Sequence, residues 1–256
     1  MLIATSIGQG FNLIILPGGP GLSSNTIKAF DDFSTNFRVT YLDYCGTNNS
    51  PNTKLTFNDL VQEISSFVQK LEGKTILMGH SYGGVLASQV AVTSNCDGLI
   101  CLGTPFTSRS LKLASNNFAN HNDEELKIAA NKWSEVKSKE TFNGWLAEYK
   151  ELWFVKKNIE FGKNLLKHDQ SSFNFFLSNR NDILENSTVI TNLSNWKKPK
   201  LFLAGEKDLL LPPDILEQDA NEGGFSYSVI SNASHFLMWD NYSEVSEKIN
   251  SFIFPL

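Results

Sequence analysis

The chain has 256 residues, a length that suits one large α/β domain or a core interrupted by an inserted segment. Hydrophobic residues make up 41% of the chain and charged residues 19%, a composition that excludes disorder throughout the chain. The net charge of -5 at pH 7 excludes the strongly basic character typical of proteins that bind nucleic acid or anionic membranes.

The cysteines and the N-terminal sequence indicate where the protein acts. Cys45, Cys96 and Cys101 form an odd set without CxxC spacing, which argues against a disulfide framework and against a thiolate zinc site. The apolar start MLIATSIGQG has no basic residue before Lys28, so it differs from a secretory signal, and no apolar stretch is long enough to span a bilayer. We therefore predict a cytoplasmic protein without a membrane or nucleic-acid partner, and the sequence leaves its oligomeric state open.

Four short apolar runs in the first hundred residues predict strands that are buried on both faces. They are FNLIIL, RVTYLDY, TILMG and DGLICLG, and they are rich in aliphatic and β-branched residues. Helical spacing occurs between them, because the apolar residues from Phe57 to Leu71 fall on one helix face and the segment from Val85 to Val92 directly follows the third run. This alternation predicts an α/β fold with a doubly wound, mostly parallel sheet.

The strand pattern stops after Pro105. Residues 106–196 have mainly helical patterns, and strand runs return at KLFLA and FSYSVI before a helical pattern closes the chain. The sequence therefore predicts an α/β core of residues 1–105 and 197–256, with a helical cap of residues 106–196 inserted after the sixth core strand.

A G-x-S-x-G motif lies between the TILMG strand and the helix that follows it, at Gly79-His80-Ser81-Tyr82-Gly83. A sharp strand-to-helix turn needs glycines two positions either side of the serine, where larger side chains would clash. Such a turn holds the serine in a strained conformation with its Oγ exposed. We predict that Ser81 is a nucleophile, the alternative being a serine that caps an ordinary helix.

The glycine-rich turn Pro17-Gly18-Gly19-Pro20-Gly21 ends the first core strand. Acyl transfer needs two N–H donors for the developing oxyanion, and a glycine turn can present a backbone N–H without side-chain obstruction. We assign these donors to Gly19 and to Tyr82, the residue after the nucleophile. The alternative for the glycine run is a plain strand-to-helix turn.

His235 and Asp208 are the candidates for the general base and its carboxylate partner. His235 lies in the polar loop after the last strand run, and Asp208 follows the KLFLA strand at the edge of the sheet where ligands collect in open α/β folds. The carboxylate would orient the imidazole and stabilise its protonated form. Glu206 and Asp43 also follow strands and compete with Asp208 for that role, and the order Ser, Asp, His is typical of one hydrolase fold.

The sequence lacks the signatures of metal and nucleotide sites. It has no H-E-x-x-H and no P-loop, and Gly8-Gln9-Gly10 lacks the third glycine of a dinucleotide fingerprint. The acidic run at 122–125 is typical of a first helical turn, where it compensates the helix dipole. We therefore expect chemistry that needs no cofactor and no metal.

Taken together, these motifs resemble the α/β-hydrolase superfamily, and within it the proline-iminopeptidase-like branch of serine aminopeptidases. The shared features are Gly-Gly-Pro-Gly-Leu-Ser at 18–23, GHSYGG at 79–84, GEKD at 205–208 and SHFLMW at 234–239. The resemblance covers nearly the whole chain. It implies the α/β-hydrolase fold and hydrolysis of a small-molecule or short-peptide substrate through an acyl-enzyme.

The chain departs from this branch at positions that bear on specificity. Pro17 stands where a His usually precedes the glycine run, and the segment 43–50 lacks one of the glycines usual after the next strand. Leu209 replaces a Glu that holds the substrate's amino group in some members. The 16 residues before Pro17 leave room for only one of the usual two leading strands.

Three functions stay open on this basis: an aminopeptidase of the proline-iminopeptidase type, a small-molecule carboxylesterase, and a non-catalytic binding protein. The complete set of Ser81, Asp208 and His235 argues against the third. An aminopeptidase must pair a protonated amine with carboxylates, for which Asp182 and Glu185 late in the insert are the candidates, the alternative being solvated surface. Two aromatic residues of the insert, Trp145 and Trp153, are candidates for lining the substrate pocket.

Overall fold

A computed structural model describes residues 2–181 and 188–254 of the protein. Its centre is a sheet of seven strands. The strands are β1 (Ile3–Ile7), β2 (Phe11–Leu16), β3 (Phe37–Asp43), β4 (Thr75–His80), β5 (Gly98–Leu102), β6 (Lys200–Gly205) and β7 (Ser226–Ile230). All four apolar runs of the first hundred residues form strands, as do KLFLA and most of FSYSVI.

The strand order in the sheet is β1-β3-β2-β4-β5-β6-β7. Every pair is parallel except β1 with β3, which is antiparallel from Ile3 opposite Asp43 to Ile7 opposite Val39. The predicted doubly wound, mostly parallel sheet is confirmed. One strand, β1, precedes β2 in the described part of the chain.

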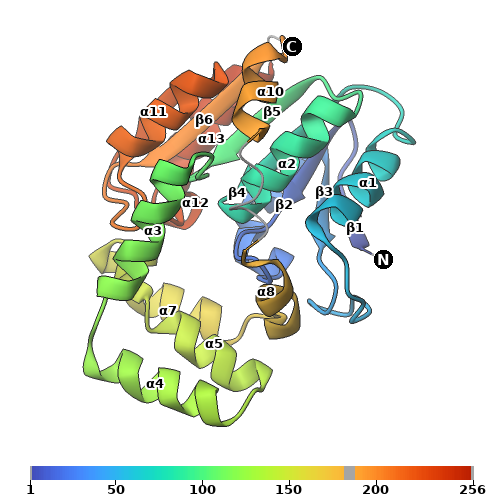
Figure 1. The fold of residues 1–256 in the computed structure, drawn as a ribbon. Helices are drawn as coiled ribbons and strands as arrows, with labels where there is room; N and C mark the ends of the chain where they lie inside the picture. Colours follow the sequence, from blue (N-terminus) through green and yellow to red (C-terminus); the bar gives the residue numbers. More distant parts are fainter. Residues whose placement is uncertain (1, 182–187, 255–256) are drawn as a thin grey trace.

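Helices flank the sheet and continue beyond one of its ends (Figure 1). They are η1 (Ser24–Thr35), α1 (Phe57–Val68), α2 (Tyr82–Thr93), α3 (Ser108–Asn120), α4 (Glu124–Glu135), α5 (Lys139–Ala147), α6 (Lys150–Trp153), η2 (Lys156–Asn158), α7 (Ile159–Lys167), α8 (Phe173–Asn179), α10 (Val189–Asn195), α11 (Pro213–Gly223), α12 (Leu237–Asp240) and α13 (Tyr242–Ile253).

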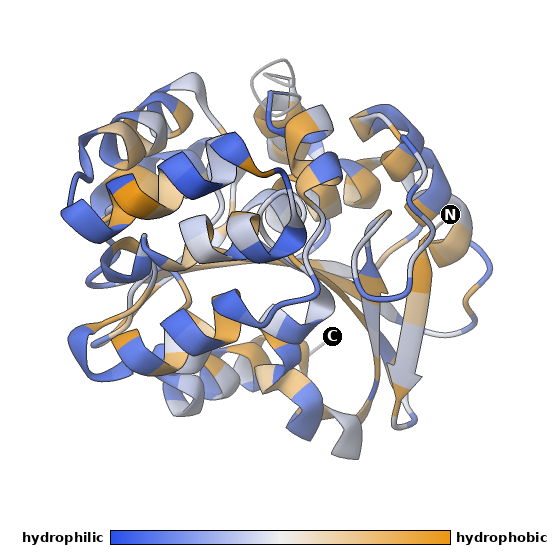
Figure 2. Cartoon of the chain, turned by 90° about the horizontal axis from the view of Figure 1, so that it is seen from below, coloured by the Kyte–Doolittle hydropathy of each residue, from blue (hydrophilic) through white to orange (hydrophobic). Residues whose placement is uncertain are grey.

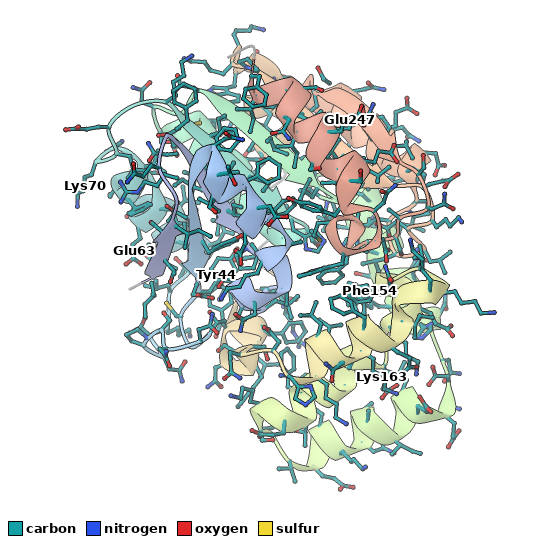
Figure 3. The ribbon with its side chains drawn as sticks, turned by 180° about the vertical axis from the view of Figure 1, so that it is seen from behind. Tyr44, Glu63, Lys70, Phe154, Lys163 and Glu247 are labelled. Atoms are coloured by element: carbon teal, nitrogen blue, oxygen red, sulfur yellow. The ribbon has the colours of Figure 1, made fainter. Side chains whose placement is uncertain are left out.

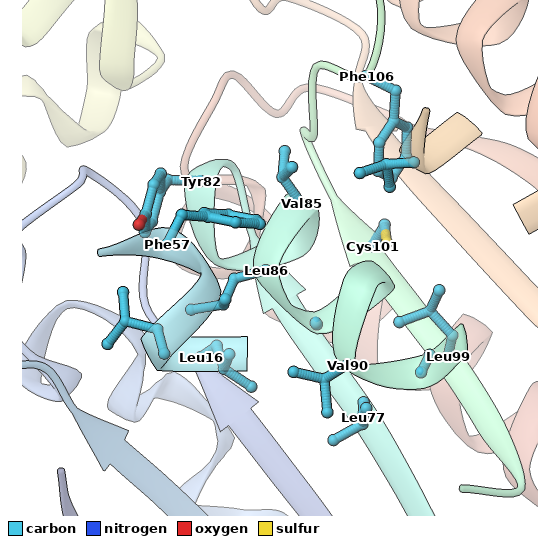
Figure 4. Packing of buried hydrophobic residues seen from close by; sticks show 14 of the residues in the cluster. Leu16, Phe57, Leu77, Tyr82, Val85, Leu86, Val90, Leu99, Cys101 and Phe106 are labelled. Atoms are coloured by element: carbon cyan, nitrogen blue, oxygen red, sulfur yellow. The ribbon is translucent and has the colours of Figure 1, made fainter. Parts of the chain in front are cut away.

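Alternate residues of the central strands supply two separate hydrophobic layers. In β2, Ile14 and Leu16 pack with α1, α2, α10 and α11, whereas Leu13 and Ile15 pack with η1, α12 and α13 on the other face. Successive side chains of a strand point to opposite faces, so a strand covered on both sides is apolar throughout. Figure 4 shows the first layer, in which Leu86 and Val90 of α2 lie over the sheet. In Figure 2 the flanking helices carry both hydrophobic and hydrophilic residues, as amphipathic helices do.

The helices α3 to α8 lie beyond the carboxyl ends of the parallel strands and form the region predicted as a cap (Figure 1). They follow β5, the fifth strand in the described part of the chain. In the middle of this region, residues 139–167 divide into α5, α6, η2 and α7. The break between α6 and η2 arises where the backbone is extended at Phe154 and Val155.

The last helix of the predicted insert, α10, packs on α2 and α11 of the core. Its buried residues Val189 and Leu193 belong to the same hydrophobic layer as those two helices. The division into a core of 1–105 and 197–256 and a cap of 106–196 remains a proposal, and the packing of α10 favours a cap that ends before Val189.

The three cysteines, Cys45, Cys96 and Cys101, are buried. Burial raises the pKa of the Cys96 thiol to about 11 and that of the Cys101 thiol to about 12. Within the described part of the chain, no helix is long and apolar enough to cross a membrane.

Candidate active site

Ser81 occupies the turn between β4 and α2 with φ 52° and ψ -118°. This positive φ is rare for a residue other than glycine and stores backbone strain. The turn needs Gly79, because a Cβ there would lie 2.2 Å from the carbonyl oxygen of Gly83. The Ser81 N–H donates to the Leu102 carbonyl oxygen at 2.8 Å, which fixes the turn against the end of β5. The G-x-S-x-G motif therefore has the strand–turn–helix context that a nucleophile requires.

Two further glycines let α2 approach the neighbouring strand ends. A Cβ on Gly83 would lie 2.3 Å from the Pro17 carbonyl oxygen, and a Cβ on Gly84 would lie 1.9 Å from Thr104 Oγ1. No side chain fits either space. The start of α2 therefore packs closely against the loops that follow β2 and β5. This packing fixes the position of Ser81 relative to these two loops.

His235 and Asp208 are in direct contact, although 27 residues separate them in the sequence. The His235 Nδ1–H donates to Asp208 Oδ2 at 2.8 Å, and both side chains are buried. The other carboxylate oxygen, Asp208 Oδ1, accepts from the N–H groups of Leu210 and Leu211, each at 2.9 Å. Three donors thus hold the carboxylate in the orientation that fixes the imidazole tautomer.

The second ring nitrogen of the same histidine, His235 Nε2, is buried and has no hydrogen-bond partner among the described residues. Because Nδ1 carries the proton donated to Asp208, Nε2 has its lone pair available to accept a proton. Space for the ring comes from Gly103, at which a Cβ would lie 3.3 Å from His235 Nδ1.

The two competing carboxylates make other contacts. Glu206 Oε2 accepts from the N–H of Asn232 at 2.7 Å and so closes an exposed turn. Asp43 is buried and accepts from both the N–H and the Oγ of Ser24. Of the three candidates, Asp208 alone is hydrogen-bonded to His235 within residues 2–181 and 188–254.

His80 is a residue near the site whose role the sequence did not indicate. Its Nε2–H donates to the carbonyl oxygen of His235 at 3.0 Å, and its ring lies 4.9 Å from the His235 ring. Burial, followed by the proximity of His235, holds the pKa of His80 well below its usual range, so the ring is neutral. His80 therefore supports the backbone of His235. The sequence signal that could have indicated this role is the place of His80 at the end of an apolar strand, directly before Ser81.

Gly19 and Tyr82, the predicted oxyanion donors, line one cavity together with Ser81. Gly19 has φ +118°, and a Cβ there would lie 2.6 Å from the Gly21 nitrogen, so only glycine fits. Tyr82 is the first residue of α2, where the helix dipole favours negative charge. Figure 4 shows the Tyr82 ring beside Phe57, in the hydrophobic layer beneath the site.

The cavity has a volume of about 520 Å³ and extends from Ser81 to the cap. The candidate pocket residues Trp145 and Trp153 line it, and the Trp153 ring lies 5.4 Å from the His235 ring. The remaining cap residues in the lining are mostly apolar: Leu111, Ala114, Ser115, Phe118, Ala119, Leu146, Tyr149, Leu166, Phe176, Arg180 and Asn181. The predicted amine-binding residues Asp182 and Glu185 lie outside the described residues.

Arg180 carries the one formal charge among the described residues that line this cavity. Its guanidinium lies 5.9 Å from the centre of the Phe176 ring, within the range of a cation–π contact. No Asp or Glu of the described chain belongs to the lining. The described walls therefore provide an apolar surface with one cation.

The described residues contain no cluster of three or more His, Cys, Asp or Glu side chains suited to a metal ion. The groups that acyl transfer uses are all present: a serine on a strained turn, a histidine bonded to a carboxylate, and two candidate oxyanion donors.

Comparisons with known proteins agree with the topology. The sequence profile of the alpha/beta hydrolase fold family matches residues 12–242. A proline iminopeptidase of Saccharolobus solfataricus is 22% identical over 96% of this chain and 86% of its own length. A second proline iminopeptidase, from Pestalotiopsis fici, is 34% identical over 100 residues, and the match spans 36% of this chain and 36% of that enzyme.

Among solved structures, a thermophilic esterase from Thermogutta terrifontis superposes with a TM-score of 0.76 at 19% identity. The superposition covers 98% of this chain and 92% of the esterase. At that identity the likeness concerns the fold.

Proposed function

Since the chain belongs to the α/β-hydrolase family and is a hydrolytic enzyme, we propose that it is a serine hydrolase that acts through Ser81, His235 and Asp208. The hydrogen bond between His235 Nδ1 and Asp208 Oδ2 supports this assignment, as does the strained turn at Ser81. The proposed substrate is a small molecule or a short peptide. The proposed cytoplasmic location rests on the odd number of cysteines and on their lack of CxxC spacing.

In the proposed reaction, Ser81 Oγ attacks the substrate carbonyl carbon while His235 Nε2 accepts the hydroxyl proton. The N–H groups of Gly19 and Tyr82 stabilise the tetrahedral oxyanion, and Asp208 stabilises the imidazolium. Collapse of the intermediate breaks the bond to the leaving alcohol or amine, which takes the proton from His235. Water then attacks the acyl-enzyme while His235 Nε2 accepts a proton from it. Collapse of this second intermediate releases the acid, and Ser81 Oγ takes the proton back from His235.

For the substrate, we favour an ester with a bulky apolar group, and the composition of the cavity carries this choice. A protonated α-amine in a water-poor pocket needs carboxylate partners, whereas the described lining contains none and presents the cation Arg180. Rings such as Trp145 and Phe176 suit an apolar acyl or aryl group instead. The proposed enzyme is therefore a small-molecule carboxylesterase.

An aminopeptidase is the second candidate, because two of the relatives are named proline iminopeptidases. Asp182 directly follows the lining residue Asn181 in the sequence, and Glu185 is three residues further. Under this alternative, these two carboxylates would hold the substrate's amino group.

The nucleophile is tested with a fluorophosphonate probe, which should label Ser81 covalently. Ser81→Ala should remove the label while the near-UV circular dichroism of the protein stays unchanged. Ser115→Ala is the matched control, because Ser115 lines the same cavity and should not affect labelling. A label that mass spectrometry places on another residue contradicts the assignment.

The substrate class is tested by comparing short-chain aryl esters with prolyl and alanyl aryl-amides, each amide with a free and an acetylated amino group. An esterase should hydrolyse the esters much faster and show no preference for a free amine. A preference for the free amine that disappears in Asp182→Asn or Glu185→Gln would establish the aminopeptidase instead.

A further inference from the structure

Residues 169–172 lie in the cap between α7 and α8, where they contact the loop that carries Gly19. We call these four residues the strap. Residues 17–24, from the end of β2 to the first residue of η1, are the oxyanion loop. The Ser172 N–H donates to the Gly21 carbonyl oxygen at 2.8 Å. Asp169 accepts from Ser23 two residues further along the loop. The strap therefore contacts the oxyanion loop at two successive points.

The contact between Asp169 and Ser23 is buried on both sides, since Asp169 is 2% exposed and Ser23 is fully buried. Asp169 Oδ2 accepts from the Ser23 N–H at 3.0 Å, and Oδ1 accepts from the Ser23 hydroxyl. On the cap side, Asn143 Nδ2 donates to the Asp169 carbonyl oxygen at 2.7 Å. The carboxylate is thus positioned by the cap and directed at the loop.

Glycines in the core leave room for the strap. A Cβ on Gly21, which has φ +90°, would lie 2.5 Å from the Ser172 carbonyl oxygen. A Cβ on Gly46 would lie 2.6 Å from Ser172 Oγ. Close packing of this kind leaves the strap little freedom to shift relative to the loop.

The oxyanion loop is held at four positions around Gly19. The core supplies two of the contacts: the Tyr44 hydroxyl donates to the Pro17 carbonyl oxygen at 2.8 Å, and Asp43 binds Ser24. The strap supplies the other two, at Gly21 and Ser23. Gly19 lies between the contact at Pro17 and those of the strap, so its N–H direction depends on both ends of the loop.

We propose that Asp169 is a positioning residue, which holds the oxyanion loop from the cap so that the Gly19 N–H points at the developing oxyanion. This inference rests on the proposed serine-hydrolase function. It makes the cap a part of the catalytic centre: the oxyanion site is complete only when the strap is docked.

The test compares a ligand that forms a tetrahedral adduct with one that does not. Phenylboronic acid adds to a catalytic serine and occupies the oxyanion site, whereas benzyl alcohol occupies only the apolar cavity. In Asp169→Asn, the inhibition constant of the boronic acid should rise and kcat should fall, each by roughly 10- to 100-fold, somewhat less than the loss of an oxyanion donor costs. KM and the inhibition constant of benzyl alcohol should stay unchanged. If the substitution disturbed the whole cavity, both of these values would rise as well.

Asp219→Asn is the matched control. Asp219 is equally buried and accepts from the N–H groups of Phe106 and Thr107, where it ties the start of the cap to α11. Its loss should lower stability without weakening the boronic acid relative to benzyl alcohol. If Asp169→Asn does not fold, Ser23→Ala removes the hydroxyl contact with Asp169 and the cap on the Asn25 N–H, and keeps the bond from the Ser23 N–H. A smaller weakening in the same direction is then expected.

Unchanged boronic acid binding and unchanged kcat in folded Asp169→Asn or Ser23→Ala would overturn the inference alone. If the wild-type protein is neither labelled by a fluorophosphonate nor inhibited by the boronic acid, the proposed function fails and the inference falls with it. The two failures are distinguishable, because the first leaves the wild-type activity intact.

Discussion

The buried carboxylate of Asp169 should make the free energy of unfolding depend on pH. The variant Asp169→Asn should lack this dependence. Burial raises the pKa of Asp169 from 3.8 to about 6, although the hydrogen bonds from Ser23 act in the opposite direction and the charge of Asp43 adds to the rise. Between these two pH values the folded state binds more protons than the unfolded state. The free energy of unfolding therefore falls as the pH rises from about 4 to about 6.

The size of the effect follows from the difference between the two pKa values of Asp169. A difference of about two units at roughly 1.4 kcal/mol per unit corresponds to about 3 kcal/mol. Asparagine has no ionisable proton in this range, so the variant lacks this contribution at every pH. The difference in the free energy of unfolding, wild type minus Asp169→Asn, should thus decrease by up to about 3 kcal/mol between pH 4 and pH 7.

Urea unfolding of both proteins at pH 4, 5, 6 and 7, followed by circular dichroism, measures this difference. Titrating groups that do not interact with Asp169 contribute equally to both proteins and cancel. Parallel pH profiles would refute the reasoning, and a difference that grows with pH would mean that the Ser23 hydrogen bonds outweigh burial.

Three further predictions concern the carboxylate bonded to His235, the glycine of the turn at Ser81 and the cation that lines the cavity. Asp208→Asn should lower kcat by up to about 10⁴-fold in a steady-state ester assay, while Glu206→Gln should leave it nearly unchanged because Glu206 bonds only the exposed turn; the reverse result would move the acid role to Glu206. Gly79→Ala should lower the free energy of unfolding in urea by at least about 1–3 kcal/mol, because its Cβ meets the backbone of the turn at Ser81. Gly144→Ala, with open space around it, should raise that free energy by roughly 0.5–1 kcal/mol. Equal effects would count against the crowding argument. Arg180→Gln should keep kcat/KM for neutral esters and raise it for free-amine substrates, and an unchanged ratio would show that Arg180 does not repel the amine.

The sheet and the positions of the candidate catalytic residues could be predicted because their signals are local. A strand such as β2 is apolar throughout, since both of its faces are covered, and the glycines around Ser81 are required by the turn itself. His235 and Asp208 each follow a strand, and parallel neighbours bring such ends to one edge of the sheet.

The contacts between cap and core could not be predicted in the same way. Asp169 lies in the short polar sequence Asp-Gln-Ser-Ser, and its partner Ser23 is 146 residues away, so no periodic pattern connects them. The helix α10 has the composition of the preceding helices, and only its packing on α2 and α11 places it with the core. At the break after α6, the ring of Phe154 (Figure 3) stacks on that of Phe236 with 4.8 Å between the ring centres, a contact between cap and core that no local pattern indicates.

The burial of the three thiols provides a route to spectroscopy of the cap. At neutral pH the protonated, inaccessible Cys96 and Cys101 should react slowly with maleimide or nitroxide reagents, and Cys45 is buried as well. A pair of new cysteines at exposed positions, Lys132 on α4 and Glu247 on α13 (Figure 3), would therefore carry spin labels without removal of the native ones. The distance distribution between the two labels, recorded with and without phenylboronic acid, would report directly how far the cap moves when the oxyanion site is filled.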